Sequence, residues 1–375
     1  MLGSSRLEEI AANVTGPAGI RSMSTNLVNT PKGGGGRSSV SGLVATVFGA
    51  TGFLGRYVVQ QLAKVGTQVF IPYRGTDMDY MHLKPMGDLG QIVPREFSLR
   101  DESSIREAIG QSNIVINLIG RDHETRNFSF EDVYVTAPAT IARLVKEHGG
   151  IERLVHVTCL GASKSSPSRR HQAMAAGEEA VHAEYDKATI LRPGAMFGTE
   201  DRLLNKWAIM SKKFSVVTIV DGGKTRLQPV HVVDVAGAVM AAIRDDGQSL
   251  GKIYELGGPD VTTVRDLVEL MFETIRENPQ ILSIPMPLAE LVTAPRELLL
   301  RRLPIPLPSP TFWTREYLET LKQDQIVSGD ALTFSDLGLT PRKLEGVAIE
   351  HLYAYRAGGP SFGKTVGERV SGAGW

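Results

Sequence analysis

Three glycines spaced three residues apart, Gly49, Gly52 and Gly55, form the pattern in this 375-residue chain that points most directly to chemistry. They follow a β-branched apolar run at 43–48 and precede residues 56–65, where apolar side chains recur at helical intervals. Between a strand and a helix, such glycines allow a tight turn, close approach of the backbone to phosphate, and packing of helix on strand. The helix N-terminus adds unpaired N–H groups and a positive dipole end. The sequence therefore predicts a pyrophosphate-binding loop.

A basic residue stands where this kind of loop usually has an acidic one. The next apolar run, 68–72, is followed by Arg74, roughly 20 residues beyond the glycines, where an acid would receive the ribose hydroxyls of NAD. An arginine can instead pair with the 2′-phosphate of NADPH. The sequence thus favours NADPH over NADH, and the alternative is a solvated arginine in a loop.

Further apolar runs at 92–97, 114–120, 154–159 and 189–198 recur at the intervals of an α/β fold. We expect a Rossmann-type doubly wound parallel sheet with a smaller C-terminal α/β lobe. Ligands of such sheets bind beyond the carboxyl ends of the strands. The residues predicted to bind the cofactor are Gly49, Thr51, Gly52, Phe53, Leu54, Gly55, Tyr73, Arg74, Ser98, Leu99, Leu118, Ile119, Gly120, Thr158, Pro193 and Gly194.

The glycine motif, the strand spacing and the segment Pro229–Ala236 resemble the extended short-chain dehydrogenase/reductase family over about 43–260. The resemblance places a second-lobe helix after Pro229–Ala236. In active members, a Tyr-x-x-x-Lys pair after the strand ending near Thr158 transfers a proton. Arg170 and Met174 stand at the corresponding positions, and neither side chain can do so near neutral pH. We therefore expect no catalytic residues.

Two alternatives to a non-catalytic protein stay open. An active NADPH-dependent reductase or epimerase would need a displaced acid such as His171 or Tyr185 beside the nicotinamide. A surface histidine in a basic loop is the favoured interpretation of His171, and Tyr185 and Lys187 are too close in sequence to share a face. The other alternative is a soluble sensor of the NADPH/NADP⁺ ratio.

A narrower resemblance rests on Ser166–Arg169, Ala175–Glu178 and Arg192–Asn205, and extends over most of 43–355. These segments are similar to the NAD(P)H-binding accessory subunits of mitochondrial respiratory complex I. The resemblance implies a non-catalytic subunit that binds NADPH structurally and supports assembly. It further implies other complex I subunits as partners and a peripheral location on the matrix side of the inner membrane.

Composition excludes several other classes of protein. Lys plus Arg and Asp plus Glu both number 41, and this neutrality argues against binding of nucleic acid. Cys159 is the only cysteine, so an intramolecular disulfide is impossible. The histidines show no metal-ligand spacing, and we expect no metal site. No apolar run approaches the 18 or so residues that cross a bilayer, so we expect no membrane span.

The chain divides into four parts by composition. Residues 1–40, rich in Ser and Gly, are typical of a disordered arm or a mitochondrial presequence, with a cleavage-site-like stretch at 21–25. We assign 41–200 to an NADPH-binding Rossmann domain and 201–355 to a C-terminal lobe that interleaves with it and is used for docking. The glycine-rich residues 356–375 are expected to be a flexible tail.

Residues 286–303 are predicted to form an amphipathic helix with a kink at Pro295. Its expected apolar face consists of Leu288, Leu291, Val292, Leu298, Leu299 and Leu303. A basic amphipathic helix can lie on a membrane surface or a partner protein, and the alternative is packing on its own domain. The resemblance favours the membrane interface, so lipid contact through 286–303 is part of the hypothesis. Leu303–Pro308 is expected to be a stiff connector.

Overall fold

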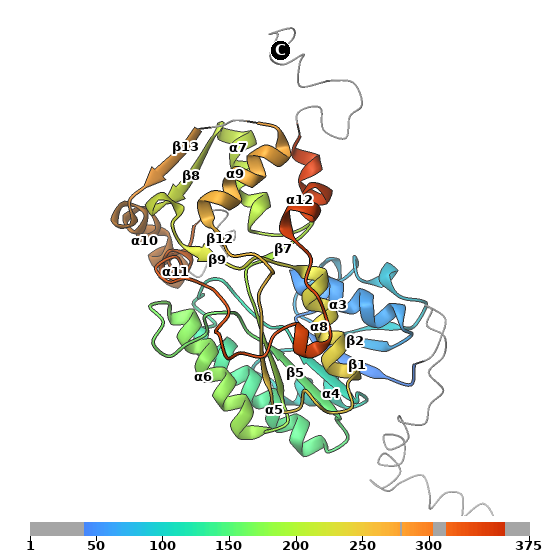
Figure 1. The fold of residues 1–375 in the computed structure, drawn as a ribbon. Coiled ribbons are helices and arrows are strands. Elements are labelled where there is room, and N and C mark those ends of the chain that lie inside the picture. The colour runs from blue at the N-terminus through green and yellow to red at the C-terminus, as the bar shows by residue number, and fades with distance from the viewer. Residues whose placement is uncertain (1–40, 278–279, 303–312, 357–375) are drawn as a thin grey trace, which may run out of the picture.

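The computed structural model describes residues 41–277, 280–302 and 313–356, with backbone alone for 296–302 (Figure 1). The predicted presequence or arm at 1–40, the connector at 303–308 and the tail from 357 onward lie outside the described residues.

A seven-stranded parallel sheet in the order β11-β6-β5-β4-β1-β2-β3 dominates the larger lobe. Every neighbouring pair in it is parallel. The order runs outward from β1 in both directions, as in a doubly wound fold, so the expected Rossmann-type sheet is confirmed. Its strands are β1 (Val44–Phe48), β2 (Gln68–Tyr73), β3 (Ile92–Glu96), β4 (Ile114–Asn117), β5 (Arg153–Val157), β6 (Thr189–Pro193) and β11 (Ile253–Leu256).

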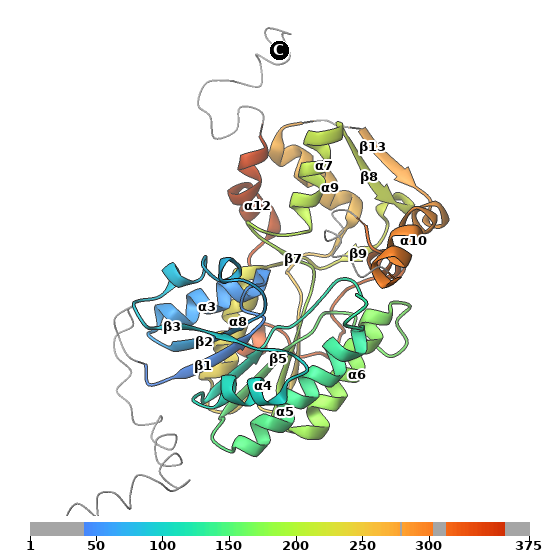
Figure 2. The same cartoon turned by 180° about the vertical axis from the view of Figure 1, so that it is seen from behind.

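Helices cover both faces of this sheet (Figures 1 and 2). On one face lie α3 (Phe53–Lys64) and α8 (Val232–Arg244), and on the other lie α4 (Glu102–Ile109), α5 (Ala137–His148) and α6 (Arg169–Glu184). Strands buried on both faces need apolar residues at successive positions, which explains the near-continuous apolar runs in the sequence.

Helix α8 packs on the larger lobe, so its expected position in the second lobe is wrong. It starts at Val232, and Val235 and Val239 are fully buried in the same cluster as Val58 and Leu62 of α3. Most residues of α8 are buried, and a helix that is apolar around most of its circumference must be covered on several sides. Helix α3 on one side and strands β5 and β6 beneath provide that cover.

The second lobe is separate from the sheet in Figure 2. It has a core of its own, built on Trp207, Leu267 and Met271. Its helices are α7 (Leu204–Phe214), α9 (Val264–Ile275), α10 (Met286–Arg302), α11 (Arg315–Thr320) and α12 (Leu344–Leu352). Its parallel pair is β8 (Val216–Val220) with β13 (Gln280–Ile284). Two short pairs connect the lobes, β7 (Met196–Phe197) with β10 (Val230–His231) and β9 (Arg226–Leu227) with β12 (Thr262–Thr263).

Helix α10 confirms the helix predicted at 286–303, and it contains Pro295. The helix packs on its own lobe through Ala289, which is fully buried beside Leu318 of α11. The first part of the expected apolar face does not take part in this packing. The exposed fractions are 50% for Leu288, 69% for Leu291 and 65% for Val292. Within the described ranges, no helix combines the length and apolar character needed to cross a bilayer.

Helix α6 lies against the π-helical turn Asp132–Thr136 that leads into α5. At Gly177, a Cβ atom would stand 1.8 Å from the carbonyl oxygen of Tyr134. A backbone atom cannot move aside as the end of a flexible side chain can, so the contact requires glycine. Gly177 therefore sets the distance between the two helices.

We expect Gly177→Ala to lower the free energy of unfolding by about 3 kcal/mol, since the added methyl group must push two helices apart. The matched control is Gly346→Ala in α12, where a Cβ would meet no atom within 4 Å. There, alanine should raise stability by about 0.5–1 kcal/mol through its helix propensity. Urea unfolding of both variants tests this, and similar effects at the two sites would contradict it.

Candidate functional site

A pocket of about 180 Å³ lies beyond the carboxyl ends of β1, β2 and β4. Two of its lining residues, Pro72 and Phe97, were not predicted from the sequence. The predicted residues that it brings together are Gly49, Thr51, Gly52, Tyr73, Arg74, Leu99, Leu118, Ile119 and Gly120. The location agrees with the general rule for ligands of doubly wound sheets.

The β1–α3 turn approaches its neighbours so closely that side chains are excluded. Gly49 has a φ of +79°, and a Cβ there would lie 2.8 Å from the carbonyl group of Leu118. A Cβ on Gly55 would lie 2.4 Å from the carbonyl oxygen of Ala50. The N–H of Gly52 donates to the carbonyl of Gly49 at 3.0 Å. These contacts hold the first turn of α3 at the floor of the pocket.

The N-terminus of α3 has no side-chain cap, and its N-cap residue is Gly52. The first amides of a helix lack intrahelical acceptors and attract anions. The side chain of Leu54 is buried in the core, and that of Phe53 packs edge to face on Tyr57. Phe53 and Leu54 could therefore contribute to anion binding through their backbone N–H groups.

A buried polar pair that the sequence did not reveal supports the wall of the pocket. The side-chain oxygen of Asn117 accepts from the N–H of Ile119 at 3.1 Å, and its Nδ2 lies 3.1 Å from Nδ1 of His156. Burial lowers the pKa of His156 to about 4, so its ring is neutral and can accept that hydrogen bond.

The other predicted cofactor residues do not line this pocket; they are Phe53, Leu54, Gly55, Ser98, Thr158, Pro193 and Gly194. The hydroxyl of Thr158 donates to Glu178 at 2.5 Å. The N–H of Gly194 donates to the carbonyl of Leu256 at 2.9 Å, and a Cβ there would stand 2.4 Å from the carbonyl oxygen of Gln228. Gly194 thus continues the pairing of β6 with β11 and lies against the segment that connects β9 with β10.

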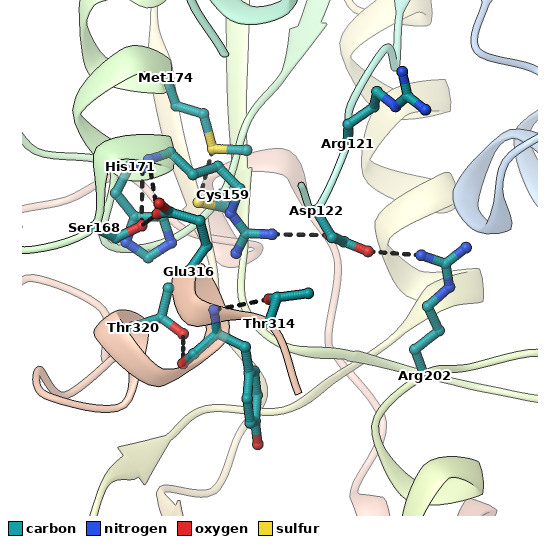
Figure 3. A network of polar contacts seen from close by, with 12 residues as sticks. Arg121, Asp122, Cys159, Ser168, His171, Met174, Arg202, Thr314, Glu316 and Thr320 are labelled. Carbon is teal, nitrogen blue, oxygen red and sulfur yellow. Dashed lines mark hydrogen bonds and ion pairs between the residues drawn. The ribbon is translucent and has the colours of Figure 1, made fainter. Parts of the chain in front are cut away.

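Arg170 and Met174, which the sequence predicts to replace the family's proton-transfer pair, make contacts within the fold, and Figure 3 shows Met174 beside Cys159. Arg170 donates from Nη1 to Asp122 at 2.9 Å, and its backbone N–H donates to Glu316 of α11 at 3.2 Å. The Sδ atom of Met174 lies 3.1 Å from Sγ of Cys159. Arg170 thus bridges the lobes, and Met174 packs in a small core of the larger lobe with Phe130 and Tyr134.

The segment 199–202 forms a junction between the lobes, because its side chains contact residues of the larger lobe. Arg202 donates to Asp122 at 2.6 Å, so Asp122 receives two arginines from opposite lobes (Figure 3). Glu200 accepts from the hydroxyl of Tyr57 at 2.9 Å and lies 3.5 Å from Arg56, both in α3. The junction therefore contacts both the helix that begins at the pocket and the loop that follows β4.

Two titratable groups beside this junction were not predicted. The hydroxyl of Tyr134 donates to the carbonyl of Arg121 at 2.5 Å and accepts from its N–H at 2.7 Å, and burial raises its pKa to about 12. The ammonium of Lys206 lies 3.9 Å from the ring centre of Tyr317. Burial lowers the pKa of Lys206 to about 7, although the charge of Asp122 opposes this shift. Neither position carries a motif, so only the fold brings them here.

His171 is buried, which corrects the expected surface position in a basic loop. It lies in the first turn of α6 with 4% of its surface exposed, and its Nδ1 is 3.5 Å from the hydroxyl of Ser166. Burial, and secondarily the charge of Arg170, lower its pKa to about 4. The expectation failed because α6 already begins at Arg169 and turns His171 toward Gly161.

The burial of His171 predicts a pH dependence of stability. As the pH falls below about 6.5, an unfolded chain takes up a proton at His171 while the folded chain, with a pKa of about 4, does not. The free energy of unfolding should therefore decrease between these values by up to about 1.4 kcal/mol per pH unit. His171→Gln should reduce this slope, whereas His148→Gln, at an exposed ring, should not. Equal slopes in all three proteins, from urea unfolding at several pH values, would contradict the assignment.

Comparison with known proteins agrees with this geometry. Residues 45–257 match the NAD dependent epimerase/dehydratase family. The Arabidopsis thaliana protein NADH dehydrogenase (ubiquinone) 1 alpha subcomplex subunit 9, mitochondrial, is 55% identical over 90% of this chain and 84% of its own length. The Rattus norvegicus protein of the same name is 43% identical over 87% of this chain and 84% of its own.

A solved structure shows the same fold in a more distant protein. An NADPH-dependent quinone oxidoreductase from Escherichia coli superposes with a TM-score of 0.61 at 18% identity, over 82% of this chain and 99% of that one. The chain therefore belongs to the NAD dependent epimerase/dehydratase family and, within it, to the family of the mitochondrial alpha subcomplex subunit 9 proteins.

Proposed function

We propose that this chain is a non-catalytic accessory subunit of mitochondrial NADH:ubiquinone oxidoreductase that binds NADPH as a structural ligand and supports assembly. The observation that carries this proposal is the identity to the plant relative along nine tenths of the chain, since the name of that protein states the complex. The proposed location is peripheral, on the matrix side of the inner membrane, in contact with other complex I subunits.

The absence of catalysis is supported by what Arg170 and Met174 do. A proton shuttle needs a group that titrates near neutral pH and is free to reach the substrate. The guanidinium of Arg170 is bridged to Asp122, and Met174 packs on Cys159. Both contacts occupy the region where a catalytic pair would act, so the proposed role of the site is binding alone.

The residues present fit NADPH. The glycine turn and the α3 N-terminus are suited to its pyrophosphate, and Arg74 lines the same pocket. Burial, and then the charge of Arg121, lower the pKa of Arg74, and a bound anion would offset both effects. Because NADPH would bind only the folded chain, its binding would add to the free energy of unfolding.

In this proposal, the domain at 41–200 binds the nucleotide and the lobe at 201–355 is used for docking. The exposed apolar side chains of α10 support a docking role, because contiguous exposed apolar residues mark interaction surfaces. Contact of 286–303 with lipid or with a neighbouring subunit would cover them.

We expect Arg74→Gln to weaken NADPH binding about 10- to 100-fold and to leave NADH binding nearly unchanged, because one charge-assisted contact to the 2′-phosphate is lost. Isothermal titration calorimetry on the purified chain measures both. The control is Arg106→Gln, whose guanidinium is paired with Glu102 and Glu147 on α4 and α5. Equal losses for both nucleotides would contradict the 2′-phosphate contact, and oxidation of NADPH with a carbonyl substrate would establish the reductase instead.

We expect tagged full-length chain expressed in mitochondria to migrate with the intact complex on native gels and to release about one NADPH per chain. The double variant Leu291→Glu and Val292→Glu should reduce this co-migration, because it places two charges on the apolar face of α10. Leu89→Glu, at a fully exposed position of the larger lobe, is the matched control. Migration of the wild-type chain as a free monomer would contradict the proposal.

A further inference from the structure

The amino group of Lys206 has an aromatic ring beside it in place of an acidic partner. Its Nζ atom lies 3.9 Å from the ring centre of Tyr317 in α11. Among the residues that the structure describes, Lys206 forms neither a hydrogen bond nor an ion pair with another side chain. An aromatic face attracts a cation but offers its N–H groups no acceptor oxygen. Lys206 therefore lacks the carboxylate contact that Lys164, for example, makes with Glu179 at 2.7 Å.

The position of Lys206 in the first turn of α7 also disfavours a positive charge. The unpaired N–H groups at a helix N-terminus make that end positive, and α7 has no acidic residue in its first turn. The carboxylate of Asp201 lies before the helix and accepts from backbone N–H groups at this end. It thus satisfies the backbone, and it makes no ion pair with Lys206.

The acidic residue whose charge does act on Lys206 is Asp122, and it is already engaged. Asp122 accepts from Arg170 at 2.9 Å and from Arg202 at 2.6 Å. Burial lowers the pKa of Lys206 to about 7, and the charge of Asp122 only opposes this shift. A substantial share of the amine is therefore uncharged near neutral pH and carries a free electron pair.

The surroundings of Lys206 keep the amine uncharged without sealing it from solvent. Burial raises the pKa of Tyr317 to about 12, so the phenol beside the amine stays neutral. Lys206 itself is only partly buried, so its amine can be reached from the side that the ring does not cover. A desolvated lysine with a lowered pKa is a nucleophile toward carbonyl carbon. The geometry thus combines a fixed position, an unshared electron pair and access.

We propose that Lys206 is a site of Nε-acylation by acyl thioesters. Its nitrogen attacks the carbonyl carbon of the thioester, so that a C–N bond forms and the C–S bond breaks. The electron pair of the C–S bond leaves with the thiolate, and the proton of the amine passes to water. The product is a neutral amide, so the modification removes one positive charge where the second lobe faces Asp122.

The test measures acetylation of the folded full-length chain by deuterium-labelled acetyl coenzyme A, with peptide mass spectrometry at each lysine. Near pH 7, we expect Lys206 to react about 10-fold faster than Lys213. Lys213 is the matched control, because it belongs to the same helix and lies 5.4 Å from the ring of Phe214 but is exposed. Between about pH 7 and pH 9, labelling of Lys213 should rise about 10-fold per unit, whereas labelling of Lys206 should level off.

Two further measurements assign the effect to the fold. In unfolding concentrations of urea, the two lysines should react at similar rates, and Lys206→Arg should abolish the fast labelling while leaving that of Lys213 unchanged. Labelling of Lys206 that is no faster than that of Lys213 in the folded chain would overturn the proposal. Fast labelling by acetic anhydride but none by acetyl coenzyme A would also overturn it, because the thioester could then not reach the amine. Neither outcome bears on nucleotide binding or on assembly, so the proposed function is tested separately.

Discussion

The approach of the β1–α3 turn to the end of β4, close enough to exclude a Cβ atom, is the constraint on which the nucleotide pocket depends. Gly49 lies against the carbonyl of Leu118, and Gly55 lies against the backbone of Ala50. Because no side chain intervenes, the amides of α3 and the wall at 118–120 face one small space. Asn117 then holds that wall with hydrogen bonds that burial makes costly to break.

A second consequence of the fold is that Asp122 and Glu316 connect the two lobes at the start of α6. Asp122 follows the pocket wall and receives Arg170 and Arg202, and Glu316 accepts from the backbone of Arg170 and from Ser168 at the start of α6. A buried arginine needs such a partner, because desolvation without one is expensive. The contacts of Arg170 with Asp122 and Glu316 therefore serve as a structural connection between the lobes.

Local patterns in the sequence were sufficient to predict the sheet and much of the pocket. The strands, the glycine turn and Arg74 could be placed because apolar periodicity and glycine spacing report on nearest neighbours in the chain. Local patterns could not predict the burial of His171, the position of α8 or the exposure of α10. Each of these depends on which distant surface packs against the helix.

Because α8 packs on the larger lobe although it lies late in the sequence, the larger lobe can be completed only after α8 is available. The surface of α3 that α8 covers belongs to residues near position 60, but its cover lies near position 240. The carboxylate of Glu316 arrives later still, 148 residues after the Ser168 that it binds. A chain that enters a compartment from its N-terminus must therefore keep an apolar helix face unprotected while about half of its length follows. Until the distant segments arrive, this exposed apolar surface is prone to aggregation.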